Sequence, residues 1–191
     1  MDCFFQNDAD FDWLYPRQFQ LMSPKQWTPL NVANIAAGYL NVPGAKILDV
    51  GSGIGKFCLA AAHLYPDVNF IGVEQREELV HYAKVAKNYL KLNNASFIHA
   101  NITQLNFKEF DHFYFFNSFY ENIETENAID DTIETSYGLY DYYTQYLQYA
   151  LKDKPSGTRV VTYHSLGEIL PDGFKLLHLS FFTQLRLWIK E

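Results

Sequence analysis

The chain has 191 residues, 48% of them hydrophobic, and a formal net charge of −7. This size and apolar content predict one domain with a full hydrophobic core. The negative balance argues against a nucleic-acid partner, because such affinity comes mostly from basic contacts to phosphates. The apolar runs are too short for a membrane span, and the acidic start lacks the basic leader and apolar core of a signal peptide. We therefore expect a cytoplasmic protein that does not associate with a membrane.

Cysteine and histidine positions give no sign of a metal centre or of a disulfide framework. The two cysteines, Cys3 and Cys58, lie far apart in the sequence, and the six histidines are scattered without the spacing of metal ligands. A reducing compartment such as the cytosol fits this pattern, and no metal site is expected.

Helical and strand patterns alternate along the chain, beginning with a helix from Thr28 to about Leu40. Thr28 is the expected capping residue, and Pro29 suits the first helical position. Four side chains of this helix share the face that is expected to pack on a sheet: Val32, Ile35, Ala36 and Tyr39.

Further along the chain, apolar runs predict strands and amphipathic stretches predict helices. The expected strands are 46–50, 69–74, 96–100, 112–116, 158–163, 174–180 and 184–190, and the expected helices are 56–65, 76–92 and 137–152. This alternation predicts an α/β fold, with a mostly parallel sheet covered by helices on both faces. The last two strands leave no room for a helix between them, so we expect an antiparallel hairpin. The whole chain, 1–191, is expected to form one domain.

The segment ILDVGSGIGKF joins an expected strand to an expected helix through Gly51, Gly53 and Gly55. Glycines in such a turn let the backbone approach a ligand, and the helix start at Lys56 offers free N–H groups. Glu74 ends the next strand, where a carboxylate can accept hydrogen bonds from ribose hydroxyls. Because the turn follows a strand, opens a helix and has this acidic partner, it predicts a site for an adenosine-containing cofactor. A tight turn without a ligand is the alternative.

Asp49, two residues before Gly51, bears on which cofactor is bound. A carboxylate at this place would repel the diphosphate of a nicotinamide dinucleotide. It would tolerate the cationic methionine end of S-adenosylmethionine, or hold it through the ammonium group. The residue therefore favours S-adenosylmethionine, and a dinucleotide-dependent oxidoreductase is the less favoured alternative.

Together with VEQ at 73–75, the glycine turn resembles the first two motifs of class I S-adenosylmethionine-dependent methyltransferases. The resemblance covers about residues 28–191 and implies the Rossmann-like fold of that family, a seven-stranded, mostly parallel sheet with a C-terminal antiparallel hairpin. The segments QWTPLNVANIA, FFNSF and TRVVTYHSLGEILP are similar to a bacterial group of these enzymes with poorly assigned substrates. Parts of the chain also resemble the non-SET histone-lysine methyltransferases.

The resemblance implies roles for individual residues. Asp49 would lie near the methionine part of the cofactor, Glu74 at the ribose and Gln75 beside the adenine. Asn101 stands where many members of the family have an acidic residue near the adenine amino group, and the residues before the first helix would close over the methionine end. The full set of implied cofactor contacts is Thr28, Pro29, Asp49, Gly51, Ser52, Gly53, Gly55, Glu74, Gln75, Asn101, Ile102, Asn117 and Phe119.

The fourth expected strand runs into Asn117-Ser118-Phe119-Tyr120, which this fold would set beside the transferable methyl group. The segment has the spacing of the N-P-P-Y motif of amino-group methyltransferases without its prolines, and it is also similar to the N-N-F segment of the histone-lysine enzymes. Asn117 and Tyr120 are therefore candidate catalytic residues. His164, at the end of the fifth strand, is a candidate general base because imidazole titrates near neutrality. The alternatives are a structural strand cap for Asn117 and a structural role for His164.

Two segments flank this predicted site, an N-terminal extension at 1–27 and an acidic insertion at 121–138. The insertion is either a solvated loop or an acidic lid that attracts a cationic substrate. The expected function is N-methylation of a protein side chain or of a small cationic molecule. A non-catalytic module that only binds S-adenosylmethionine is the alternative.

Overall fold

The computed structural model describes residues 5–123, 129–130, 132–164, 169–181 and 184–191. Its strands are β1 (Lys46–Val50), β2 (Asn69–Glu74), β3 (Ala95–His99), β4 (His112–Phe116), β5 (Arg159–Tyr163), β6 (Phe174–Ser180) and β7 (Leu185–Lys190). They form one sheet with the order β3-β2-β1-β4-β5-β7-β6. Neighbours pair in parallel from β3 to β5, and β7 pairs antiparallel with both β5 and β6. The predicted sheet with its closing antiparallel hairpin is confirmed.

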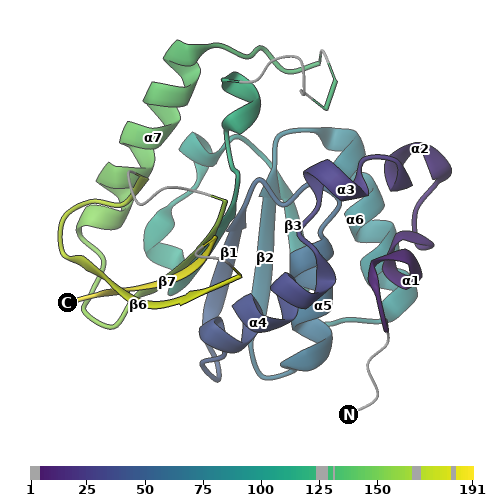
Figure 1. Cartoon of the computed structure of the whole chain (residues 1–191), viewed down its shortest axis with the longest axis horizontal. Coiled ribbons are helices and arrows are strands. Elements are labelled where there is room, and N and C mark those ends of the chain that lie inside the picture. Colours follow the sequence, from purple (N-terminus) through teal and green to yellow (C-terminus); the bar gives the residue numbers. More distant parts are fainter. Residues whose placement is uncertain (1–4, 124–128, 131, 165–168, 182–183) are drawn as a thin grey trace.

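Helices cover both faces of this sheet (Figure 1). One face carries α4 (Leu30–Leu40), α5 (Lys56–Leu64) and α6 (Glu77–Leu90), and the other carries α7 (Tyr137–Lys152). Successive side chains of a strand point to opposite faces, which divides the core into two clusters. Ile47 of β1 belongs to the cluster under α4, α5 and α6, whereas its neighbour Leu48 belongs to the cluster under α7. The predicted helices therefore form close to their expected bounds.

The register of the strands brings several loops to one edge of the sheet. Asp49 of β1 pairs with Gly72 of β2 and with Tyr114 of β4. Because these strands are parallel, the residues that follow each of them meet at the same edge, and the strand order reverses between β1 and β4. Ligands of open α/β sheets bind at such a reversal point. The fold therefore gathers the glycine turn and the segments after β2 and β4 around one site.

Residues 5–27, most of the predicted extension, pack against the domain and are called the arm. The arm contains α1 (Asp8–Asp12), α2 (Arg17–Gln20) and α3 (Ser23–Gln26), which lie on the same side of the molecule as α6 in Figure 1. Trp13 is exposed, but the other aromatic side chains of the arm are buried in the core under α5 and α6: Phe5, Phe11, Tyr15, Phe19 and Trp27. The Nζ of Lys56, a residue 3% exposed, lies 2.6 Å from an oxygen of Asp8 and 3.0 Å from one of Asp12. The arm is thus an integral part of the domain.

The start of α4 differs from the prediction. Pro29 is the N-cap, without a side-chain capping bond, and Leu30 is the first helical residue. The extended backbone at Pro29, with a ψ of 141°, moves the helix start one residue along the chain and leaves Thr28 outside the capping position. Thr28 instead points inward, where its Oγ1 lies 3.0 Å from the hydroxyl of Tyr114. Ile35 was also placed wrongly, since it is 40% exposed.

Within the described ranges, every helix is too short or too polar to cross a membrane.

Candidate functional site

A cavity of about 480 Å³ opens at the edge of the sheet where β1, β2, β4 and β5 end. Its walls come from the arm, the glycine turn, the residues after β2 and the ends of β4 and β5. Two smaller pockets, of about 50 and 20 Å³, share Gly51 with this cavity. The larger of these is lined in part by Gln75, Asn101 and Ile102, and the smaller by Thr28, Asp49 and Ser52. Residues predicted separately from the sequence therefore meet around one space, whose size is typical of small-molecule sites.

The glycine turn uses its three glycines for two different purposes. Gly51, Gly53 and Gly55 all have positive φ, of 73°, 53° and 85°, a conformation that favours glycine. A Cβ added at Gly53 would meet no atom within 4 Å, so the backbone is open to the cavity there. A Cβ added at Gly55 would lie 2.5 Å from the ring of Phe97, and Gly55 is not part of the cavity wall. Packing, rather than close approach to a ligand, explains the third glycine.

Glu74 ends β2 at the cavity wall and is 6% exposed. Its Oε2 accepts a hydrogen bond from the N–H of Gly53 at 3.1 Å, and its Oε1 accepts one from the N–H of Arg76 at 3.0 Å. Burial raises the pKa of this carboxyl, while the two N–H groups and the charge of Arg76 act to lower it. The carboxylate is therefore held beside the glycine turn, at the place predicted for ribose recognition.

Asp49 is a buried acid without a charge partner. It is 4% exposed, and no cation in the described ranges forms an ion pair with it. Burial raises its pKa from 3.8 to about 7, although the thiol of Cys58 donates a hydrogen bond to it at 3.5 Å. The nearby Oγ of Ser52 is buried and has no hydrogen-bond partner in the described structure. A bound cation with polar neighbours would satisfy both groups, so this corner fits the methionine end of S-adenosylmethionine.

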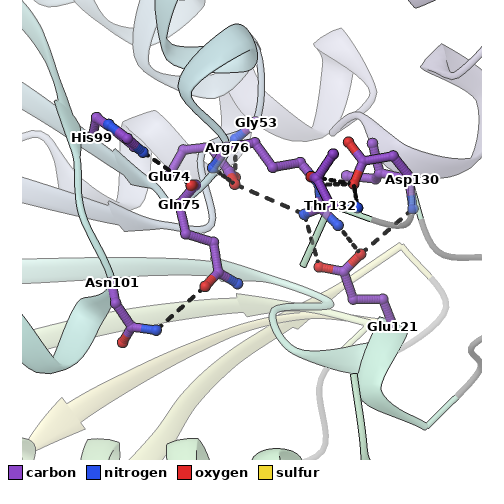
Figure 2. Close-up of polar contacts among 10 residues, drawn as sticks. Gly53, Glu74, Gln75, Arg76, His99, Asn101, Glu121, Asp130 and Thr132 are labelled. Atoms are coloured by element: carbon purple, nitrogen blue, oxygen red, sulfur yellow. Dashed lines mark hydrogen bonds and ion pairs between the residues drawn. The ribbon is translucent and has the colours of Figure 1, made fainter. Parts of the chain in front are cut away.

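The side chain of Asn101 is fully engaged within the protein. Its Nδ2 donates to Oε1 of Gln75 at 3.3 Å and to the hydroxyl of Tyr143 at 2.7 Å. Its Oδ1 accepts hydrogen bonds from the N–H and the hydroxyl of Thr103, each at 3.0 Å. Figure 2 shows the bond that joins Asn101 to Gln75. A direct bond from Asn101 to an adenine would have to replace one of these four, so in this structure Asn101 orients Gln75.

The segment that follows β4 turns sharply at the cavity. Asn117 and Phe119 both have positive φ, of 48° and 73°, and both line the cavity. The Oγ of Ser118 donates to the carbonyl of Val50 at 2.7 Å, which ties the segment to the end of β1. Such backbone conformations are costly for residues other than glycine and concentrate at functional sites. The side chain of Tyr120, the other predicted catalytic residue of this segment, lies outside the described part of the structure.

His164 lines the same cavity as Asn117. Its ring is exposed and lies against Tyr163, with 4.3 Å between the ring centroids, and 6.0 Å from the ring of Phe116. Partial burial lowers the pKa of this imidazole, which favours its neutral form near neutral pH. A neutral imidazole beside Asn117 is able to take a proton from the molecule that is to be methylated.

Sequence reasoning did not identify two parts of this wall. The arm contributes Lys25 and Trp27, and the residue after Gln75 contributes Arg76, which is only 4% exposed. The compositional pattern gave no signal for the arm, because an acidic segment at a chain start is commonly solvated. For Arg76 the available signal was its position directly after the predicted cofactor residues at the end of β2.

Two acids of the predicted insertion, Glu121 and Asp130, pair with Arg76 in the described structure. Glu121 lines the cavity, but both its oxygens accept hydrogen bonds from the guanidinium of Arg76 at 2.9 Å. Asp130 accepts a further bond from the same group at 3.0 Å. The other predicted acids of this segment include Glu124, Glu126 and Asp131, which lie outside the described residues. Arg76 carries one positive charge against the two carboxylates of Glu121 and Asp130, so it offsets only part of their attraction for a cation.

Comparisons with known proteins identify the family of this chain. Residues 41–176, more than half of the chain, match a family model described as "Methyltransferase domain". A tRNA (guanine-N(7)-)-methyltransferase from Synechococcus sp. (strain JA-3-3Ab) is 49% identical over 55 residues, 29% of this chain and 23% of the relative. The chain thus matches less than a quarter of the length of that curated relative.

Two solved structures have a similar fold. TrmN from Thermus thermophilus has a TM-score of 0.63 at 22% identity, covering 92% of this chain and 52% of that one. An RNA methyltransferase from Salinibacter ruber in complex with S-adenosyl-L-homocysteine has a TM-score of 0.54 at 19% identity, covering 85% and 91%. The family match also decides between the two cofactors considered above, against the nicotinamide dinucleotide. The chain therefore belongs to the methyltransferase domain family, as a class I methyltransferase with S-adenosylmethionine as its cofactor.

Proposed function

We propose that the chain transfers the methyl group of S-adenosylmethionine to a nitrogen atom of its acceptor. The observation that carries the proposal is the shared cavity, which brings Asn117 and His164 together with Glu74 and the glycine turn. A nitrogen acceptor is also supported by the curated relative, whose name specifies the N(7) atom of guanine.

When bound, the cofactor supplies an already activated methyl group. In this proposal the residues of the chain therefore only need to bind the cofactor, align the acceptor and shield the site from water. Glu74 holds the ribose hydroxyls, and Asp49 meets the ammonium of the methionine part. Asn117 orients the acceptor nitrogen with its amide. His164 takes the proton that a protonated amine must lose before its lone pair can attack.

The leading acceptor class is an amine, either on a protein side chain or in a small cationic molecule. A neutral imidazole at the cavity is the group that a protonated amine requires, and the lowered pKa of His164 provides it. The aromatic rings of Phe116 and Tyr163, 5.1 Å apart at the same wall, suit an alkylammonium group. Arg76 offsets one of the two negative charges of Glu121 and Asp130, so this pair keeps a net charge of about −1 that would favour a cation only weakly.

A second acceptor class is a base in tRNA, which the curated relative favours. A ring nitrogen with a free lone pair needs no base, so His164 would then have no proton to accept. The net charge of −7 weighs against this class, whereas the exposed Lys25 at the cavity wall would suit a phosphate group. Nuclease treatment distinguishes the two classes, because it would destroy a tRNA acceptor but not an amine acceptor.

Methyl transfer from labelled S-adenosylmethionine separates these possibilities. The purified chain is incubated with bulk tRNA, with a protein extract and with a set of small amines, and each fraction is assayed for label. Asn117→Ala should reduce incorporation by about tenfold or more while leaving cofactor affinity within about threefold. The matched control is Asn88→Ala, because Asn88 is an exposed residue of α6 away from the cavity. Cofactor binding without label in any fraction would support the non-catalytic module instead.

A further inference from the structure

Arg76 lies at the centre of a cluster of three carboxylates. Its Nη1 and Nη2 donate to the two oxygens of Glu121, each at 2.9 Å, and its Nε donates to Oδ1 of Asp130 at 3.0 Å. Its Nη1 also lies 3.9 Å from Oε1 of Glu74. Figure 2 shows the guanidinium with these carboxylates around it. These four residues are called the Arg76 cluster.

The Arg76 cluster joins parts of the chain that serve different sides of the cavity. Glu74 ends β2 beside the glycine turn, whereas Glu121 belongs to the segment that continues from Asn117 and Phe119. Asp130 lies 54 residues after Arg76 in the sequence and is itself held by Thr132, which donates its N–H at 3.0 Å and its hydroxyl at 2.7 Å. Without the guanidinium, nothing in the described contacts connects Glu74 to Glu121.

We infer that Arg76 is a positioning residue that couples the cofactor carboxylate Glu74 to the wall carrying Glu121, so that cofactor binding depends on the pairing of Arg76 with that wall. The inference rests on the proposed function, in which Glu74 holds the ribose. Arg76 acts through Glu74 and Glu121 and needs no contact with the cofactor. Its side chain, 4% exposed, is unavailable as a solvated charge, which leaves this pairing as its role in the described structure.

The planar guanidinium is suited to this task in a way that an ammonium is not. Arginine offers several N–H groups in a fixed fork, which matches the two oxygens of Glu121 and still reaches Asp130. A lysine at the same place would keep the charge but lose the two-point geometry. Removing one partner of a buried, hydrogen-bonded ion pair leaves the other charges uncompensated, and this cost exceeds the loss of the bonds themselves.

The experiment measures the affinity for S-adenosylmethionine by calorimetry in the wild type, R76Q, R76K, E121Q and the double variant R76Q/E121Q. R76Q should weaken binding by about tenfold or more, and R76K by less, because it keeps the charge. The double variant should bind at least about threefold better than R76Q, since removing Glu121 relieves the uncompensated charge. The control is R159K, because Arg159 donates to the carbonyl of Tyr39 at 2.8 Å and lies outside the cavity wall.

A pH series distinguishes positioning from a purely structural role. Arg76 acts to lower the pKa of Glu74, which burial raises, while Asp49 and Glu121 are the other charged groups that act on that carboxyl. Without Arg76 the carboxyl gains its proton at a higher pH, so the ratio of R76Q to wild-type affinity should fall as pH decreases. Taking the ratio cancels the titration of Asp49, which both proteins share.

The outcomes separate this inference from the proposed function. A wild type that fails to bind S-adenosylmethionine would refute the proposed function and with it the role of Arg76. If the wild type binds, equal affinity in R76Q, or a ratio that stays constant with pH, would overturn the inference alone. Should R76Q fail to fold, E121Q decides the question: it should weaken binding while R159K does not, and an unchanged affinity in E121Q would contradict the coupling.

Discussion

Replacing Asp49 with asparagine is expected to stabilise the cofactor-free protein, by an amount that grows with pH. The wild-type carboxyl is 4% exposed, and no cation in the described ranges pairs with it. Burial raises its pKa from 3.8 to about 7. One pKa unit corresponds to about 1.4 kcal/mol, so at about pH 8 the ionised acid costs the folded state on the order of 4 kcal/mol.

Whether stability rises or falls with pH depends on which state, folded or unfolded, binds more protons. Between about pH 4 and about pH 7 the unfolded wild type has lost the proton of Asp49 while the folded protein still holds it. The contribution of Asp49 to wild-type stability therefore falls as pH rises through this window and levels off above it. The D49N chain has no such proton, so the difference in unfolding free energy between D49N and the wild type should widen over the same window.

Urea unfolding of both proteins, followed from about pH 5 to about pH 8, measures this difference. The exposed Asp67→Asn variant serves as the control and should change the unfolding free energy little. A difference between D49N and the wild type that stays constant over this range would refute the reasoning. Added S-adenosylmethionine should narrow the difference above about pH 7, because the ammonium of the cofactor compensates the charge of Asp49.

Further substitutions test the packing at Gly55 and the ion pairs between Lys56 and the arm. Gly55→Ala should destabilise the protein by about 2–4 kcal/mol, because the added Cβ would lie 2.5 Å from the ring of Phe97 at a φ of 85°. Gly44→Ala, at a φ of 80° but with no atom within 4 Å of the added Cβ, should cost only about 1 kcal/mol, and equal losses in urea unfolding would contradict the packing argument. Lys56→Met should cost about 3 kcal/mol because it removes the buried cation that pairs with Asp12, which is mostly buried, and with the half-exposed Asp8. Adding Asp12→Asn should recover part of that loss, and the absence of any recovery would show that the ion pair contributes nothing.

The sequence allowed the sheet and the glycine turn to be predicted because both depend on local patterns. Five-residue apolar runs such as KILDV and HFYFF form buried parallel strands, and the short connection before β7 permits only an antiparallel partner. Glu74 could be placed because parallel strands end at a common edge, so a residue at the end of β2 must lie near a turn at the end of β1.

The Arg76 cluster and the arm could not be predicted in the same way. The contacts of Arg76 with Glu121 and Asp130 span 45 and 54 residues, and each of these charges taken alone is typical of a solvated surface. Lys56 gave no signal either, because a lysine at a helix start is ordinarily exposed, whereas here it is buried against the arm. Burial of paired charges depends on the assembled fold, and hydrophobic periodicity carries no information about it.

The walls of the cavity come from residues as far apart in the chain as Met22 and His164. A ligand held there requires the arm, the centre of the sheet and the end of β5 to be in place together. Because such a ligand binds only when all these parts are folded, it stabilises the complete fold and not any single part of it. The methyl donor would then act as a folding ligand as well as a reactant, and a shortage of donor in the cell would shorten the lifetime of the protein by exposing it to proteases.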